Sequence, residues 1–403
     1  MTTSRAAQRI QRIKQSPSGA AADRALELKR QGKPIISLVV GEPDFDTPAH
    51  IRQAAWEAME RGDTRYTHNS GTPALRQAIA GKLLRENGVS YALNEIIVTH
   101  GAKSAVYLAL AATLDPGDEV IIPAPYWVSY PDMVLLCEGK PVIVPCPETV
   151  GFKLTPESLE DAITSRTRWL LINSPSNPTG ASYTAAEYRA LAQVLLRHPG
   201  VMVMTDEIYE HIRYGDQDNP NIVAIEPRLR DRTLIVNGVS KSYAMTGWRI
   251  GFIAGPADLI QAVSILKSQA AGTTCSISQA AAVAAYEGDQ SVLALQRDIY
   301  RQRRDTALAL INAVDGLSCL PPAGAFYLYI NCAGILGRRT GDGATLATDN
   351  DVVLYLLENA GVALVSGSAY GLSPYFRASI ATSLENIETG IARIAAALAR
   401  LLQ

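Results

Sequence analysis

Residues 201–209 read Val-Met-Val-Met-Thr-Asp-Glu-Ile-Tyr: an apolar run, then two carboxylates and a phenol. A short unbroken apolar run is typical of a strand that is covered on both faces. The pattern predicts a strand over residues 201–204. Further apolar runs of this kind lie at residues 96–98, 120–122, 169–172, 234–236 and 250–253. Because longer helical stretches separate these runs from about residue 49 to residue 285, the sequence predicts an α/β fold with a wound, mainly parallel sheet covered by helices.

The pattern changes after Asp289, where a long charged helix leads into an apparent α+β unit with strands at 326–330 and 362–365. We expect two domains: a large one over residues 49–288, and a smaller α+β one built from residues 1–48 and 289–403. The segment 334–348 is rich in Gly, Thr and Arg, which predicts an exposed loop. The sequence leaves open whether this loop covers a substrate.

The composition and charge of the chain argue against nucleic-acid, metal and membrane partners. The chain has 403 residues, a formal net charge of -2 and 47% hydrophobic residues, which is ordinary for a globular protein and lacks the basic excess that nucleic-acid binding needs. Its five cysteines form no CxxC pair, so we expect free thiols in a reducing, cytoplasmic setting. Neither a metal motif nor an apolar run of membrane-spanning length is present, so we expect no metal and no membrane partner.

The N-terminal 22 residues carry basic but no acidic side chains, with Asp23 the first acid. This loosely resembles an organelle transit peptide. We favour instead an amphipathic arm that packs on the body of the protein.

Polar side chains follow each predicted strand at the edge where ligands bind in open α/β sheets. Strand 96–98 leads to a helix that starts near Ser104, whose N-terminus offers free amides and a positive dipole to a phosphate. The later strands deliver an aromatic pair, an amide loop, a carboxylate with a phenol, and an amine: Tyr126-Trp127, Asn173 to Gly180, Asp206 to Tyr209, and Lys241. We expect these groups to converge on one crevice.

Lys241 lies in the run from Gly238 to Gly251, among small and apolar neighbours. Desolvation lowers the pKa of such an amine and makes it nucleophilic, so that it forms Schiff bases with carbonyl compounds, above all pyridoxal phosphate. Arg249, two helical turns or one hairpin later, is a cation suited to a phosphate. An isolated Ser-Lys-Ser would more simply be a surface loop, but the convergence of strand ends favours the functional interpretation.

These residues are where the chain resembles the fold-type I pyridoxal-phosphate enzymes, specifically the class I/II aminotransferases. The resemblance covers nearly the whole chain and is closest to the bacterial aspartate/prephenate aminotransferase branch. It is carried in order by Gly41 to Pro48, Tyr126 to Tyr130, Asn173 to Gly180, Asp206 to Tyr209, and the run from Lys241 to Arg249.

The resemblance implies pyridoxal 5'-phosphate as cofactor and three catalytic residues. Lys241 would hold the cofactor and move the proton between the substrate Cα and the cofactor's C4′ carbon. Asp206 would keep the pyridine nitrogen protonated. Tyr209 and Asn177 would bond the phenolic oxygen, and Trp127 would stack on the ring.

It also implies a phosphate site made by the backbone amides of Gly101, Ala102 and Lys103, with help from the side chain of Arg249. Gly238 stands where many relatives have a serine on the phosphate, and Ser240 is the nearest substitute. Tyr66 resembles the tyrosine that reaches the phosphate from the neighbouring subunit, which implies a homodimer with shared active sites.

For the substrate, Arg377 matches the arginine that grips the α-carboxylate, with Gly41, Trp127 and Asn177 completing the site. In the branch that this chain resembles, a lysine at the position of Lys103 and hydroxyls of the N-terminal arm read a distal carboxylate. Ser16 and Ser18 lie about where those hydroxyls belong.

We therefore expect an aminotransferase, a transferase of nitrogenous groups that works by a ping-pong cycle. It would move the amino group of an L-amino acid, aspartate or glutamate, to a 2-oxo acid. Aromatic, alanine or prephenate-type specificity stays open, as does a pyridoxal-phosphate-dependent β-lyase. A cofactor-binding regulator would carry an appended basic helix-turn-helix segment, and the aminotransferase-like pattern begins too early in this chain for one.

Overall fold

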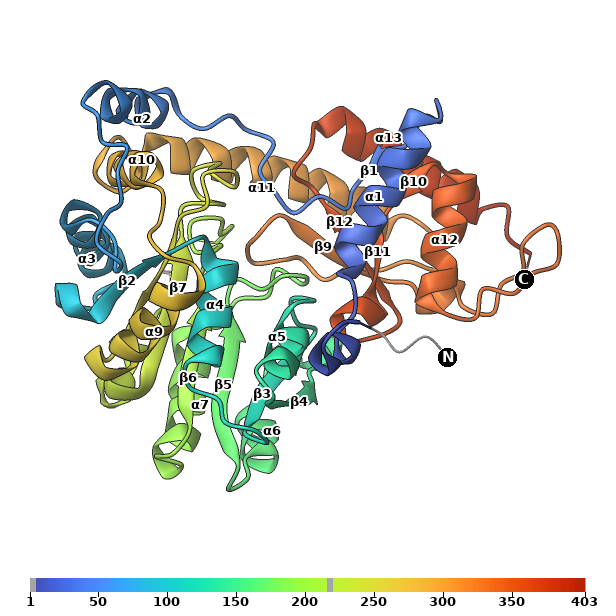
Figure 1. Cartoon of the computed structure of the whole chain (residues 1–403). Coiled ribbons are helices and arrows are strands. Elements are labelled where there is room, and N and C mark those ends of the chain that lie inside the picture. The colour runs from blue at the N-terminus through green and yellow to red at the C-terminus, as the bar shows by residue number, and fades with distance from the viewer. Residues whose placement is uncertain (1–4, 216–219, 403) are drawn as a thin grey trace.

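The computed structural model describes residues 5–215 and 220–402, and a seven-stranded sheet forms the centre of its larger part (Figure 1). The strands lie in the order β2 (Ile96–Thr99), β8 (Gly251–Ala254), β7 (Thr233–Gly238), β6 (Met202–Asp206), β5 (Thr167–Asn173), β3 (Glu119–Ala124) and β4 (Lys140–Pro145). All neighbours from β7 to β4 are parallel, whereas β8 is antiparallel to both β7 and β2. The predicted α/β class and mainly parallel sheet are confirmed.

Apolar side chains of these strands are buried on both faces of the sheet. In β5, Leu170 and Ile172 join the core on one face, and Trp169 and Leu171 join the core on the other. This alternation explains the unbroken apolar runs, because each face is covered by helices. One face packs against α3 (Pro73–Asn87), α6 (Pro156–Ala162), α7 (Ala185–Arg197), α8 (Ile222–Ile225) and α10 (Ser276–Glu287), and the other against α4 (Ala102–Ala111), α5 (Tyr130–Leu136) and α9 (Ala257–Ala270).

The N-terminal and C-terminal parts of the chain together form a second, smaller group of strands. Its antiparallel sheet has the order β11 (Val365–Ser366), β12 (Tyr375–Ser379) and β9 (Tyr327–Asn331), and a separate parallel pair joins β1 (Ile36–Ser37) to β10 (Val362–Ala363). The helices of this part are α1 (Pro17–Arg30), α12 (Asp349–Asn359) and α13 (Leu384–Leu398). The β1–β10 pair shows how the two ends of the chain are joined.

Two helices connect or flank these parts. Figure 1 shows α11 (Ser291–Asn312), the predicted long charged helix, running from α10 toward the smaller sheet, while α2 (Ala49–Glu60) packs on α10. Short 3-10 helices occur at Gln8–Arg12, Leu93–Glu95, Glu148–Val150, Pro227–Arg232, Ala333–Ile335 and Gly367–Tyr370. The division into domains at 49–288 and at 1–48 with 289–403 stays a prediction.

Three local expectations differ from the structure. The edge strand β4 was not predicted, because its two prolines and partly exposed face argue against a central strand. The predicted strand 362–365 is wrong as a single element, since the chain passes from β10 to β11 at Leu364 and so joins two sheets. The helix expected near Ser104 begins two residues earlier.

The 334–348 segment lies beside the C-terminal end of the chain. Arg339 and Leu402 exchange two backbone hydrogen bonds of 2.9 and 2.8 Å, and most of the segment is exposed as predicted. Across residues 5–215 and 220–402, none of the helices combines the length and apolar character that crossing a bilayer requires.

Helix α3 anchors two loops at the carboxyl edge of the sheet through a buried cluster of polar side chains. Lys82 forms an ion pair with Glu210, which also accepts hydrogen bonds from Asn87 (2.9 Å) and Asn237 (2.5 Å). All four residues are buried. Burial raises the pKa of Glu210, but the charges of Lys82 and His211 and the hydrogen bond from Asn87 outweigh this effect and lower the pKa to about 2.

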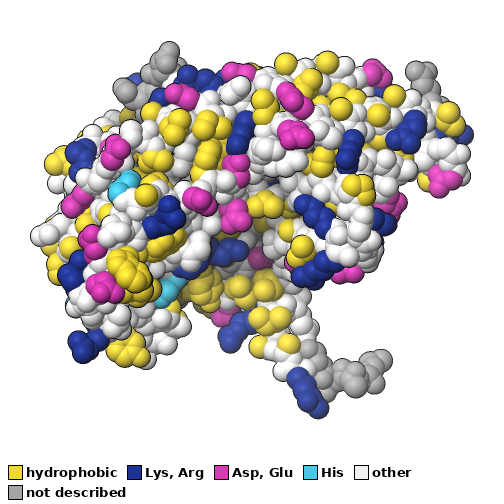
Figure 2. All heavy atoms as spheres, turned by 90° about the horizontal axis from the view of Figure 1, so that it is seen from above, with side chains coloured by type: hydrophobic (Ala, Val, Ile, Leu, Met, Phe, Trp, Pro, Cys, Tyr) yellow, Lys and Arg dark blue, Asp and Glu magenta, His cyan; other side chains and the backbone are white. Residues whose placement is uncertain are grey.

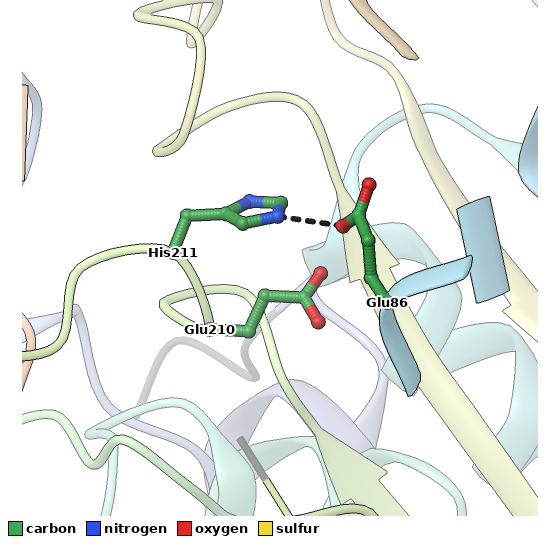
Figure 3. Close-up of side chains that lie close together, drawn as sticks. All are labelled: Glu86, Glu210 and His211. Atoms are coloured by element: carbon green, nitrogen blue, oxygen red, sulfur yellow. Dashed lines mark hydrogen bonds and ion pairs between the residues drawn. The ribbon is translucent and has the colours of Figure 1, made fainter. Parts of the chain in front are cut away.

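The cluster continues to the surface through His211, whose ring nitrogens are 2.8 Å from Ser242 and 2.8 Å from Glu86 (Figure 3). Figure 3 shows Glu86, Glu210 and His211 converging, an arrangement that a metal ion could use. Lys82 already supplies the positive charge, and both histidine nitrogens are engaged. The cluster therefore serves as an internal brace between α3 and the loops after β6 and β7.

We predict that Lys82→Met lowers the free energy of unfolding by about 3–5 kcal/mol, because it removes the buried ammonium that pairs with the buried carboxylate of Glu210. The control is Arg61→Met, which breaks an ion pair with Asp63 whose two side chains are 57% and 54% exposed, and which should cost less than about 1 kcal/mol. Urea unfolding at one protein concentration measures both. Equal small losses in the two variants would contradict the proposed brace.

Candidate active site

A cavity of about 490 Å³ lies where the carboxyl ends of β5, β6 and β7 meet the N-terminal arm and the smaller sheet. Thirteen of the residues singled out from sequence line it: Ser16, Ser18, Gly41, Ala102, Lys103, Trp127, Asn177, Asp206, Tyr209, Ser240, Lys241, Arg249 and Arg377. Figure 2 views the molecule from above, with side chains of both charges scattered among hydrophobic ones and a hollow near the middle of that face. The expected convergence of strand ends is therefore present.

Lys241 follows β7, and its amine faces the cavity. Its Nζ donates a 2.5 Å hydrogen bond to the carbonyl oxygen of Gly41. Desolvation lowers the pKa of Lys241 to about 8; Glu42 opposes this effect, and the charges of Arg249 and Arg377 reinforce it. The neutral, nucleophilic form of this amine is therefore far more populated near neutral pH than in an exposed lysine.

Asp206 ends β6 and is buried. Tyr130 donates a 2.7 Å hydrogen bond to its Oδ2, and the backbone N–H of Ile208 donates to its Oδ1 at 3.2 Å. Burial raises the pKa of Asp206 to about 6, against these bonds and the charge of Lys241. A cation placed against this carboxyl would stabilise its charged form.

Arg377 lies in the middle of β12 and is only 2% exposed. Its Nη1 donates to Asn177 Oδ1 at 2.9 Å and its Nη2 to the Val39 carbonyl at 2.5 Å. Its guanidinium carbon lies 4.3 Å from the ring centroid of Tyr327 and 5.3 Å from that of Tyr370.

The guanidinium of Arg377 is suited to an anion. Within the described ranges no carboxylate forms an ion pair with it, and its buried Nε has no hydrogen-bond partner. A buried cation is costly unless it is paired. The planar fork of donors fits a carboxylate that enters the cavity.

Two residues that position these groups were not predicted. Asn173, at the end of β5, accepts a 2.8 Å bond from the Asn177 N–H and donates a 2.8 Å bond to the Asp206 carbonyl. Tyr130 is the partner of the Asp206 carboxylate. In the sequence, each of these residues was marked only by its place within a motif at a strand end. Their shared partner Asp206 is 33 residues from Asn173 and 76 residues from Tyr130, so no local pattern reveals these contacts.

The N-terminus of α4 has the features of a second anion site. The helix begins after Gly101, which has φ 87° and offers no side-chain cap to the first amides. A Cβ on Gly101 would lie 2.6 Å from Arg249 Nη2, so the glycine permits the close approach of that guanidinium. Arg249 is held by bonds to the carbonyls of Thr246 (2.8 Å) and His100 (3.2 Å). Free amides, a helix dipole and a cation together suit a phosphate.

Gly238 and Ser240 lie on the same wall. A Cβ on Gly238 would be 2.7 Å from the Ile250 carbonyl oxygen, because β7 and β8 approach closely there. This contact explains why the position holds glycine in this chain. Ser240 lines the cavity and is buried.

Beside the N-terminus of α4, the cavity lining combines an aromatic ring with a second lysine. The Nζ of Lys103 lies 5.0 Å from the ring centroid of Trp127. Burial, and then the charge of Arg249, lower the pKa of Lys103. Ser16 and Ser18 reach this cavity from the start of α1.

Two predicted site residues do not line the cavity. Gly101 lies just behind it, against Arg249. Tyr66 is 95% exposed and lies outside the cavity lining. A single copy of the chain therefore does not bring Tyr66 into the site.

The chain is similar to bacterial proteins whose names state an activity. A protein from Rhizobium meliloti strain 1021 named aspartate aminotransferase is 55% identical over 94% of this chain and 92% of its own length. One from Cereibacter sphaeroides named aspartate/prephenate aminotransferase is 50% identical over 97% and 98%.

Among solved structures, the aspartate aminotransferase from Rhizobium meliloti matches with a TM-score of 0.97 and 53% identity over 99% of this chain and 100% of that one. The aspartate aminotransferase from Thermus thermophilus with maleate matches with a TM-score of 0.91 and 39% identity over 98% and 100%. Residues 33–394 also match the family model described as aminotransferase class I and II. The chain belongs to the aminotransferase class I and II family.

Proposed function

We propose that this protein is a pyridoxal-phosphate-dependent aminotransferase that moves the amino group of a dicarboxylic L-amino acid, aspartate or glutamate, to a 2-oxo acid in a ping-pong cycle. The observation that carries this proposal is the single cavity shared by Lys241, Asp206 and Arg377. An amine of lowered pKa, a buried acid and an unpaired buried guanidinium are the three groups that the reaction requires. The family and the names of its relatives support the same reaction.

The residues of the cavity fit pyridoxal phosphate part by part. Its aldehyde needs a neutral amine, which Lys241 supplies, and its ring nitrogen needs an acid, which is Asp206. Its phosphate suits the uncapped N-terminus of α4 with Arg249 and Ser240.

The remaining groups would hold the flat ring. Trp127 offers an aromatic face, and Tyr209 and Asn177 offer polar groups for the phenolic oxygen. When bound, the cofactor supplies an aldehyde that takes up the amino group and a ring that withdraws electrons from the substrate's Cα.

The chain's own residues then do three things. Lys241 takes a proton from the substrate Cα and returns a proton in the second half of the cycle. Asp206 holds a proton on the ring nitrogen, with Tyr130 fixing the carboxyl in place. Arg377, with Asn177 and the backbone near Gly41, orients the α-carboxylate so that the Cα–H bond faces the lysine.

A dicarboxylic substrate is supported by a second group of polar side chains in the cavity that holds Arg377. Lys103 has no ion-pair partner in the part of the chain that the structure describes, and Ser16 and Ser18 share its cavity. We propose that these three groups receive the distal carboxylate. The relatives' names include aspartate and prephenate, and the Thermus thermophilus structure holds maleate. All three compounds carry two carboxyl groups.

We also propose a homodimer with shared active sites. Tyr66 is almost fully exposed, and large apolar side chains on nearby elements are exposed as well: Trp56, Met59 and Ile265. A second copy would cover this surface and bring its Tyr66 to the phosphate site. The five cysteines are free thiols, which fits the cytoplasm that we propose as its location.

We predict that the purified protein, loaded with pyridoxal phosphate, transfers the amino group of aspartate to 2-oxoglutarate and forms oxaloacetate. A panel with alanine, phenylalanine and prephenate as alternative substrates defines the specificity. Absence of transfer with every pair would reject the proposed function. Release of pyruvate and ammonia without an oxo-acid acceptor would instead support the β-lyase alternative.

We predict that Lys103→Met lowers kcat/KM for aspartate by about 10–100-fold, as expected for the loss of a charge-assisted bond of about 1.5–3 kcal/mol. The rate with alanine, which lacks a distal carboxylate, should change less than about threefold because cofactor binding is retained. Lys29→Met, on the exposed face of α1, is the matched control. Equal losses for aspartate and alanine would assign Lys103 to the cofactor alone.

A further inference from the structure

Tyr327, the first residue of β9, touches several groups of the site although no sequence motif marked it. It is buried and lines the cavity. Its hydroxyl lies 2.9 Å from the hydroxyl of Tyr209, and its ring lies under the guanidinium of Arg377 at 4.3 Å. One side chain therefore contacts both the tyrosine proposed for the cofactor and the arginine proposed for the substrate.

The same hydroxyl packs against Gly41. A Cβ at Gly41 would lie 2.8 Å from the Tyr327 oxygen, so this contact requires glycine even though the backbone there does not have positive φ. The carbonyl of Gly41 accepts the hydrogen bond of the Lys241 amine. Tyr327 thus also restricts the position of the backbone at Gly41, whose carbonyl accepts the hydrogen bond from Lys241.

The number of available protons determines which of the two tyrosine hydroxyls is the donor in the Tyr327–Tyr209 hydrogen bond. Each tyrosine hydroxyl has one proton, and only one proton can lie between the two oxygens. If Tyr209 gives its proton to the cofactor's phenolic oxygen, Tyr327 must be the donor in the Tyr327–Tyr209 bond. Donation to Tyr209 polarises that hydroxyl and strengthens the bond it makes.

The ring of Tyr327 links this bond to the substrate site. Burial raises the pKa of Tyr327, and the charge of Arg377 opposes the effect, so the hydroxyl senses that charge. A carboxylate bound to Arg377 partly neutralises it. The donor strength of Tyr327 therefore depends on whether the substrate carboxylate is present.

We propose, on the basis of the proposed function, that Tyr327 is a positioning residue that couples carboxylate binding at Arg377 to the hydrogen bond that Tyr209 gives to the cofactor. Its hydroxyl directs the Tyr209 proton into the cavity, and its ring holds the guanidinium. Tyr327 acts through these two residues and carries out no step of the reaction itself.

The test is a pH titration of the absorbance of the bound cofactor, with and without saturating maleate. Tyr327→Phe keeps the ring and removes the hydroxyl. Because the phenolic oxygen then receives a weaker hydrogen bond, the apparent pKa of the chromophore should rise by about half a unit or more. Maleate should shift that pKa less in the variant than in the unmodified enzyme, while KM for aspartate changes less than about threefold.

Two further variants complete the test. Tyr329→Phe removes the hydroxyl of another buried tyrosine on β9, which bonds the Leu372 carbonyl at 2.7 Å, and should leave the chromophore pKa unchanged. Tyr327→Leu also removes the hydroxyl, leaves Gly41 and its contact with Lys241 unaltered in sequence, and should raise the pKa as Tyr327→Phe does. It decides the question in the same way if Tyr327→Phe does not fold.

An unchanged chromophore pKa in Tyr327→Phe, or in Tyr327→Leu, would overturn the inference if Tyr209→Phe shifts it. An equal maleate shift with and without the hydroxyl would overturn the coupling. A protein that forms no chromophore with pyridoxal phosphate would instead overturn the proposed function, and this inference with it.

Discussion

Burial of charge in one cavity is the constraint on which the rest of the site depends. Lys241, Asp206 and Arg377 lie largely out of water, where an unpaired charge is costly. Among the residues that the structure describes, none of the three forms an ion pair, and each hydrogen-bonds a neutral group: the Gly41 carbonyl, the Tyr130 hydroxyl and the Asn177 amide. These hydrogen bonds orient the three charged groups and leave their charges available to interact with a molecule that binds in the cavity. This arrangement suits a cofactor with a cationic ring and a substrate with an anionic end.

The site also depends on contacts among three parts of the chain: the smaller sheet, the N-terminal arm and the loop after β5. Arg377 comes from the smaller sheet, yet it bonds Val39 of the N-terminal arm and Asn177 after β5. Behind the large sheet, the Lys82–Glu210 pair and the contacts of His211 fix the loops after β6 and β7 to α3. A change that loosens any of these contacts should displace the catalytic groups even when it lies outside the cavity.

Sequence predicted the parts of this structure that are local and missed those that depend on long-range pairing. The apolar runs gave the central strands, and the polar residues at their ends gave most of the cavity lining, because strand ends in a parallel sheet share an edge. Tyr130, Asn173 and Tyr327 were missed because their roles rest on single hydrogen bonds to residues far along the chain. No periodicity reveals which hydroxyl will face which carboxyl. Tyr66 could be recognised only by resemblance, since it lies outside the cavity of its own chain.

The central claim is that desolvation makes the amine of Lys241 the group that attaches the cofactor. The most direct measurement is to incubate the protein with pyridoxal phosphate, reduce it with borohydride and locate the added mass by peptide mapping. The account predicts one pyridoxyl group per chain on the peptide that contains Lys241, and none there in Lys241→Ala. A protein that stays colourless, or a label fixed to Lys103, Lys267 or another amine in place of Lys241, would contradict it.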